Sequence, residues 1–172
     1  MFHQRFVAEN TFLNDILATR QIAQGLMTRE GQTVALLQTL LAAEIACILR
    51  YSAIAISPEG LQKSWIGAEF QEQANDERKH MNLLAERIEQ LGGVPDFNPR
   101  GLARQRAQPP GNLAKRIHEN LAAERCVIEH YQDMIGYFAK HDPMTAVMLG
   151  EIMRDELDHT SDMEDLLAAS GS

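Results

Sequence analysis

Hydrophobic residues recur every three or four positions along most of the chain, which is the period of an amphipathic helix. No stretch alternates apolar and polar residues as a half-buried β-strand would. Proline and glycine mark breaks in the helical pattern at 57–60, 92–95 and 141–143. We therefore expect an all-α protein. The pattern predicts a short helix at residues 11–27 and four longer helices at 32–56, 61–91, 112–140 and 143–169.

The segment that joins the second and third long helices, residues 92–111, is unusually long for a helix–helix connection. Fully extended, it could span about 66 Å, whereas a helix the length of residues 61–91 is about 46 Å long. It can therefore return the chain along its neighbours, so that the helices on either side of it run parallel. We expect a single domain over residues 1–172, with 1–30 as an N-terminal extension that carries the extra helix. Residues 31–169 would form a four-helix bundle with one long crossover.

Composition and charge narrow the function. Hydrophobic residues make up 45% of the chain and charged residues 23%, as in ordinary soluble proteins. The net charge of −8 argues against a general nucleic-acid binder, because phosphate contacts need a basic surface. Cys47 and Cys126 are too few and too far apart for a disulfide framework or a zinc site. No stretch reads as a transmembrane helix or a signal peptide, so we expect a cytoplasmic protein without a membrane partner.

Each of the four long helices carries one glutamate in the middle of its apolar face. Burying an unpaired carboxylate is so costly that it would usually protonate, so four inward-facing glutamates need a shared positive charge. In two of the helices a histidine follows the glutamate three residues later, and positions i and i+3 share a helix face. Such a pair can bind one metal ion. The candidate ligands are Glu44, Glu77, His80, Glu124, Glu156 and His159.

The candidate ligands are predicted to lie at one height in the bundle. The midpoint of Glu44 and Glu77 lies between residues 60 and 61, beside the break at 57–60, and the midpoint of Glu124 and Glu156 lies at residue 140, beside the break at 141–143. Four ionised carboxylates balance two divalent cations, and mixed carboxylate and imidazole ligands suit iron or manganese. The alternative is a set of solvent-facing charges with two core histidines. The interrupted apolar faces argue against this alternative.

The six residues and their spacing resemble the dinuclear iron site of bacterioferritins and related ferritin-like proteins. The similarity covers about residues 32–169 and includes a tyrosine seven residues after the first glutamate, Tyr51, and the segments 91–97 and 152–159. The resemblance implies a ferritin-like bundle with two iron ions per subunit. It also implies a ferroxidase that oxidises Fe(II) to Fe(III) with O₂ or H₂O₂, and iron storage and detoxification in a protein cage built from copies of the chain.

Two departures from the bacterioferritin pattern refine these expectations. Haem-binding members carry a methionine directly after the second glutamate, where this chain has Arg78, so we expect no haem. Shells of 24 subunits usually carry a fifth helix after the last long helix, and only a short segment follows His159 here. The resemblance therefore favours a 12-subunit shell of the Dps class with a bacterioferritin-type site.

Tyr51 is the candidate catalytic residue beside the metal ligands. It lies two turns after Glu44 on the same face, where it could hydrogen-bond a ligand carboxylate or supply an electron during O₂ reduction. The alternative is a core tyrosine whose hydroxyl needs only a buried partner. Cys47, one turn after Glu44, and Cys126 are either a redox-active pair or small buried hydrophobic residues.

The aspartates that directly precede two of the glutamates suggest outer hydrogen bonds. A metal-bound histidine usually donates its second N–H to a carboxylate or a carbonyl. We therefore hypothesise that Asp76 approaches His159 and that Asp155 approaches His80. The alternative is that both aspartates lie on a solvated helix surface.

Three further interpretations remain at this stage. Glu129 and His130 could form an accessory iron position, although a solvated helix face is the default. The arginines of 100–106 could contact DNA in a DNA-protecting shell, although we favour a solvated loop. A rubrerythrin-like peroxidase is disfavoured, because the sequence contains no Cys-x-x-Cys pair for electron transfer.

Overall fold

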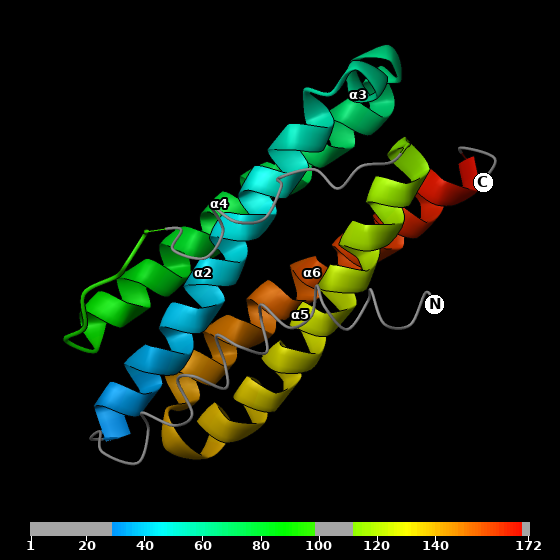
Figure 1. Ribbon diagram of the computed structural model, residues 1–172. Coiled ribbons are helices and arrows are strands. Elements are labelled where there is room, and N and C mark those ends of the chain that lie inside the picture. Colours follow the sequence, from blue (N-terminus) through cyan, green and yellow to red (C-terminus); the bar gives the residue numbers. More distant parts are fainter. Residues whose placement is uncertain (1–28, 99–111, 170–172) are drawn as a thin grey trace, which may run out of the picture. The chain divides into compact units, whose positions relative to one another are not determined.

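The computed structural model describes residues 29–98 and 112–169, and every regular element in these residues is a helix (Figure 1). The expected helix at 11–27 and the arginines of 100–106 lie outside the described residues. The prediction of an all-α protein is confirmed, and the four long helices begin and end within about three residues of the expected positions. The helices are α2 (Arg29–Ala55), α3 (Pro58–Gln62), α4 (Ser64–Gln90), α5 (Leu113–His141) and α6 (Pro143–Ala169).

The predicted break at 57–60 is not a simple turn but contains the start of the short helix α3. Ser57 is its N-cap: the hydroxyl accepts a hydrogen bond from the Gly60 N–H at 3.1 Å and donates one to the Ile54 carbonyl at 2.8 Å. Pro58 occupies the first helical position, where its missing N–H costs nothing. A Cβ atom at Gly60 would lie only 2.3 Å from the Ile54 carbonyl oxygen, so this packing requires glycine.

The described residues form two compact units. One contains residues 29–46 and 78–98, and the larger one contains 47–77 and 112–169. Helices α2 and α4 each pass from one unit into the other without a break. The expectation of a single domain over residues 1–172 stays a prediction.

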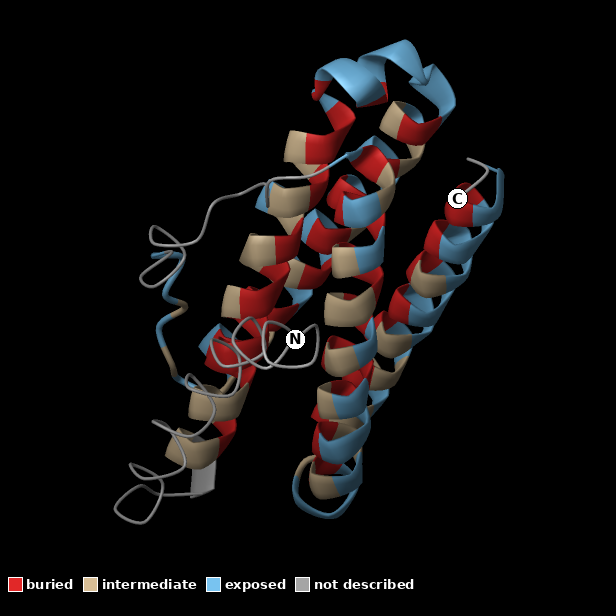
Figure 2. Ribbon diagram, turned by 45° about the vertical axis from the view of Figure 1, so that its right-hand side comes forward, coloured by how far each residue is buried: buried red, intermediate tan, exposed pale blue. Residues whose placement is uncertain are grey.

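The core of the larger unit is built from four helices, which bury one face each (Figure 2). The N-terminal parts of α4 and α5 share this core with the C-terminal parts of α2 and α6. Helices α4 and α5 therefore run parallel in this unit, and α6 runs antiparallel to both. This arrangement confirms the predicted bundle with a long crossover between the second and third long helices. Core residues include Tyr51, Ile54, Ile66, Phe70, Ile117, Leu121, Met163 and Leu166.

In the smaller unit, the first residues of the crossover are attached to α2. The Gln38 amide donates to the Asp96 carbonyl at 2.8 Å and accepts from the Asp96 N–H at 3.0 Å. A Cβ atom at Gly93 would lie 2.7 Å from a methyl carbon of Val34, so the chain passes close to α2 at this point. The same segment of α2 therefore positions the end of α4 and the start of the crossover.

The statement that no stretch reads as a transmembrane helix needs a correction. Residues Gly31–Ala55 of α2, 25 residues with a hydropathy of 1.7, are long and apolar enough to cross a bilayer by length and composition. Half of the most apolar window is buried inside the protein, and Leu37, Leu40 and Leu41 are almost fully buried. A core helix of a soluble protein passes the same test, so this finding is weak evidence for a membrane span.

Candidate metal centre

All six predicted ligand side chains are buried. No residue of the set is more than 4% exposed, so four carboxylates have lost their hydration. Carboxylates buried to this degree need cations or protons to balance their charge. The residues are Glu44, Glu77, His80, Glu124, Glu156 and His159.

In the larger unit, three helices bring four of these residues together. The Nδ1 atom of His159 on α6 lies 3.4 Å from Oε1 of Glu77 on α4 and 3.3 Å from Oε2 of Glu156 on its own helix. Ligand atoms of Glu77, Glu124 and Cys47 lie within 4.8 Å of one another. The geometry suits a cation held by two or more carboxylates and one imidazole nitrogen.

The ionisation of His159 shows the effect of these carboxylates. Burial disfavours the charged imidazolium, but the hydrogen bonds and charges of Glu156 and Glu77 outweigh it and raise the pKa of His159 to about 11. Without a metal, a proton on His159 therefore supplies positive charge to the cluster. A metal ligand must be a neutral imidazole, so a cation bound here would displace this proton.

The smaller unit contains a second pairing of the same kind. Nδ1 of His80 on α4 lies 3.6 Å from Oε2 of Glu44 on α2, and each residue is 1% exposed. A buried imidazole thus faces a buried carboxylate from a different helix in each of the two units.

The structure brings together one of the two aspartate–histidine pairs that the sequence suggested. Oδ2 of Asp76 lies 3.7 Å from Nε2 of His159, so Asp76 approaches the nitrogen that faces away from Glu77 and Glu156. The distance is longer than a hydrogen bond, but it brings together the pair that the hypothesis named. The pairing of Asp155 with His80 joins residues of different units and stays a prediction.

Tyr51 lies beside a predicted ligand in the larger unit. Its ring meets the His159 ring edge to face, with centroids 6.5 Å apart, and packs against Phe70 at 5.6 Å. The tyrosine is 1% exposed, and its hydroxyl has no hydrogen-bond partner among the described residues. The hydrogen bond to a ligand carboxylate is therefore not formed in this structure, and a catalytic role for Tyr51 stays a prediction.

The two cysteines lie in different surroundings. Both are free thiols; Cys47 is buried beside two predicted ligands, whereas Cys126 is half-buried. The Cys126 sulfur lies 3.8 Å from Nδ1 of His130, which donates a hydrogen bond to the Cys126 carbonyl at 2.6 Å. His130 is thus bonded within its own helix, and the hypothesis of an accessory iron position with Glu129 gains no contact from it.

The sequence interpretation missed one buried polar residue near this site. Gln73 on α4 is only 1% exposed, and its Nε2 donates to Oε1 of Glu69 at 3.2 Å. Gln73 precedes Glu77 by four residues, so helical spacing places it on the same face as that predicted ligand. This four-residue spacing is the sequence feature that could have identified Gln73.

Comparisons with known proteins agree with this architecture. The chain is 27% identical over 157 residues to a DNA protection during starvation protein from Pyrococcus furiosus, covering 86% of this chain and 85% of that one. A dodecameric thioferritin, the bacterioferritin-related protein from Bacteroides fragilis, has a TM-score of 0.74 and 28% identity, covering 90% of this chain and 94% of that one.

A ferritin-like diiron-carboxylate protein from Bacillus anthracis shares the fold, with a TM-score of 0.71 and 24% identity over 82% of this chain and 99% of that one. The family model of the ferritin-like domain matches residues 34–170, which is most of the chain. The chain therefore belongs to the ferritin family.

Proposed function

We propose that the protein is a ferroxidase that oxidises Fe(II) to Fe(III) at a dinuclear site within each subunit. In this proposal, Glu44, Glu77 and His80 would hold one iron ion, and Glu156, Glu124 and His159 would hold the other. Manganese fits the same ligands. The observation that carries the proposal is the burial of four carboxylates and two imidazoles in one ferritin-like chain.

The chemistry of the donor set fits this reaction. Iron supplies the electrons: two Fe(II) ions give up one electron each, which reduces one H₂O₂ and two protons to two water molecules, or O₂ and two protons to H₂O₂. The protein residues hold the ions and exclude bulk water. His159 would release its proton on binding a cation, and Asp76, 3.7 Å from its Nε2, would then accept a hydrogen bond from the other side of the ring. In this proposal Tyr51, a buried phenol beside His159, would supply an electron during O₂ reduction in place of one from iron.

We further propose that twelve copies of the chain form a cytoplasmic shell that stores the ferric product. The similar protein from Bacteroides fragilis is described as dodecameric and aligns with nearly all of this chain. A 24-subunit shell is the alternative. Arg78 follows Glu77 directly, and the proposal includes no haem.

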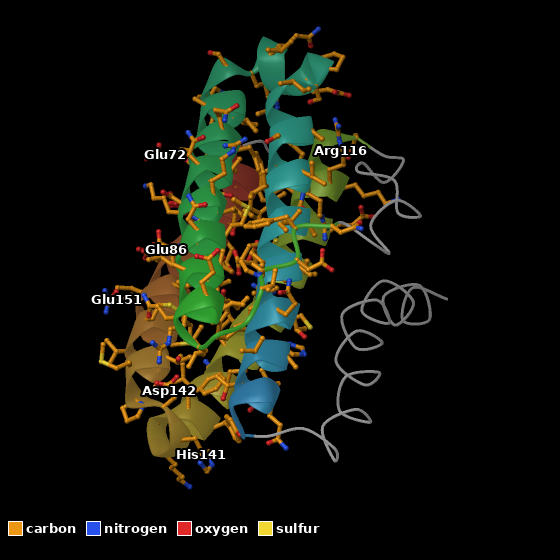
Figure 3. All side chains as sticks on the ribbon, turned by 90° about the vertical axis from the view of Figure 1, so that its left-hand side faces the viewer. Glu72, Glu86, Arg116, His141, Asp142 and Glu151 are labelled. Carbon is orange, nitrogen blue, oxygen red and sulfur yellow. The ribbon has the colours of Figure 1, made fainter. Side chains whose placement is uncertain are left out.

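The test is anaerobic addition of two Fe(II) per chain, followed by O₂ or H₂O₂, with ferric absorbance as the readout. We expect rapid oxidation by the wild type and its loss in Glu44→Ala. Glu151→Gln is the matched control, because Glu151 is an exposed carboxylate on α6 (Figure 3). Equal absorbance changes in wild type and Glu44→Ala would refute the proposed function.

A DNA-protecting shell is the second candidate, because the relative from Pyrococcus furiosus is a DNA protection during starvation protein. The net charge of −8 argues against it, since binding to the phosphate backbone needs a basic surface. A gel-shift assay of the assembled protein at physiological salt decides between the two. A shift of duplex DNA supports protection, and free DNA at micromolar protein supports storage alone.

A further inference from the structure

A row of polar residues runs along α4 next to α6 in the larger unit. Glu69, Gln73 and Asp76 are spaced by four and three residues and share one face of α4. We call these three residues and Asp162 of α6 the α4–α6 seam. Its exposure decreases from Asp162, which is exposed, through the intermediate Glu69 to the buried Gln73.

The register of the two helices places Asp162 level with Gln73. Helices α4 and α6 are antiparallel in this unit, and Asp76 meets His159 at 3.7 Å. Moving back three residues along α4 reaches Gln73, and moving forward three along α6 reaches Asp162. Asp162 is also near enough for its negative charge to act on Glu69, the partner of the Gln73 amide.

The oxygen atom of the Gln73 amide is able to accept a further interaction. Its Nε2 is bonded to Glu69, and its Oε1 has no hydrogen-bond partner among the described residues, although the side chain is buried. A buried amide oxygen without a partner destabilises the folded protein, and a bound cation would remove this cost.

The charges around Glu69 also favour a cation. Desolvation and the negative charges of Asp162 and Glu72 raise the pKa of Glu69, while the hydrogen bond from Gln73 and the charge of His159 lower it. A half-buried carboxylate surrounded by other acids is stabilised by a bound cation. Carboxylate and amide oxygens are hard ligands, which prefer Mg²⁺, Ca²⁺, Mn²⁺ and Fe²⁺ over thiophilic metals.

We propose that Glu69, Gln73 and Asp162 form an outer binding site for a hard divalent cation, with Asp76 between this site and His159. The site is separate from the six predicted ligands. The inference rests on the proposed function only in naming Fe(II) as the natural cation, which would be held at the seam before it reaches the buried centre.

The single tryptophan provides a direct probe of this site. Trp65 precedes Glu69 by four residues on α4, about 6 Å along the helix axis, whereas Glu77 lies about 18 Å from it. We propose to titrate the full-length protein with Tb(III), a hard cation, and to excite tryptophan selectively. Sensitised Tb(III) emission should appear in the wild type and be displaced by Mn(II).

Three variants make the test decisive. Glu69→Gln/Asp162→Asn should weaken Tb(III) binding on the order of tenfold or more, because two of the charged ligands are lost. Asp162→Asn alone changes an exposed residue, so it should fold normally and show a smaller loss. Glu86→Gln, an exposed carboxylate farther along α4 (Figure 3), should bind like the wild type.

The outcomes separate this inference from the proposed function. Emission that persists in Glu44→Ala but is lost in the Glu69/Asp162 variant supports an outer site, whether or not the protein oxidises iron. Emission unchanged by the Glu69 and Asp162 substitutions overturns the outer site. Emission lost in Glu44→Ala also overturns it, because Tb(III) would then occupy only the buried centre.

Discussion

At the scale of single residues, the main feature is a histidine that holds a proton where a metal is expected to bind. The imidazole of His159 lies between Glu77 and Glu156, and their charges raise its pKa to about 11. The metal-free protein therefore keeps its buried carboxylates partly balanced by protons. A cation that binds at His159 would have to displace this proton.

The first prediction concerns this exchange. At pH 7 to 8, metal binding should release about one proton from His159, and the apparent affinity should rise as the pH rises toward 11. Titration calorimetry with Mn(II), in buffers of different ionisation enthalpy, counts the protons released. The His159→Gln variant should release about one fewer per chain. Equal proton release in the two proteins would contradict the assignment of this proton to His159.

Protonation of His159 also affects the stability of the metal-free protein. Because the folded pKa of His159 exceeds its unfolded value of 6.5, its stabilising contribution is fully present below pH 6.5. This contribution declines as the pH rises and is lost as the pH passes about 11. His159 therefore stabilises the metal-free protein more at neutral pH than at alkaline pH.

At the scale of elements, periodicity predicted the four long helices well, because each has one apolar face and clear proline or glycine breaks. The interrupted apolar faces also identified the buried carboxylates, because a glutamate is rarely buried among core residues unless its charge is balanced. The helix α3 was missed because its cap bonds from Ser57 depend on local geometry. Gln73 was missed because a glutamine at a core position carries no motif.

The apolar stretch in α2 was overlooked for a related reason. Helix α2 is apolar on more than one face, and a sequence window cannot tell a buried core helix from a membrane span. The division into two units was equally beyond sequence reasoning, because the periodic pattern of α2 and α4 continues across the boundary.

The second prediction tests the turn between α2 and α4. Gly60→Ala should lower the free energy of unfolding by about 1–3 kcal/mol, because the added methyl group would collide with the Ile54 carbonyl. Urea unfolding followed by circular dichroism measures this difference. Gly136→Ala in α5 is the control: nothing lies within 4 Å of its added Cβ, so it should stabilise the protein by about 0.4–1 kcal/mol. A Gly60→Ala protein as stable as the wild type would show that this turn relaxes freely.

At the scale of the whole molecule, storage requires an assembly, and the surface of the single chain is compatible with one. Three apolar residues around α3 are strongly exposed: Ile56, Leu61 and Trp65. Clusters of exposed apolar side chains commonly mark protein–protein contacts.

The third prediction is the mass of the native particle. Native mass spectrometry should give about twelve times the chain mass of 19.3 kDa. The metal-free Glu44→Ala protein should give the same mass, because its substitution lies in the buried centre. A stable monomer or dimer would argue against storage while leaving the oxidation of Fe(II) open to its own test.

The two hydrogen bonds between Gln38 and Asp96 have a mechanical consequence. They attach the start of the crossover to α2 at one point within the smaller unit. The amide hydrogen of Asp96 should therefore exchange slowly with solvent although this residue follows the end of α4, and Gln38→Ala should make its exchange faster.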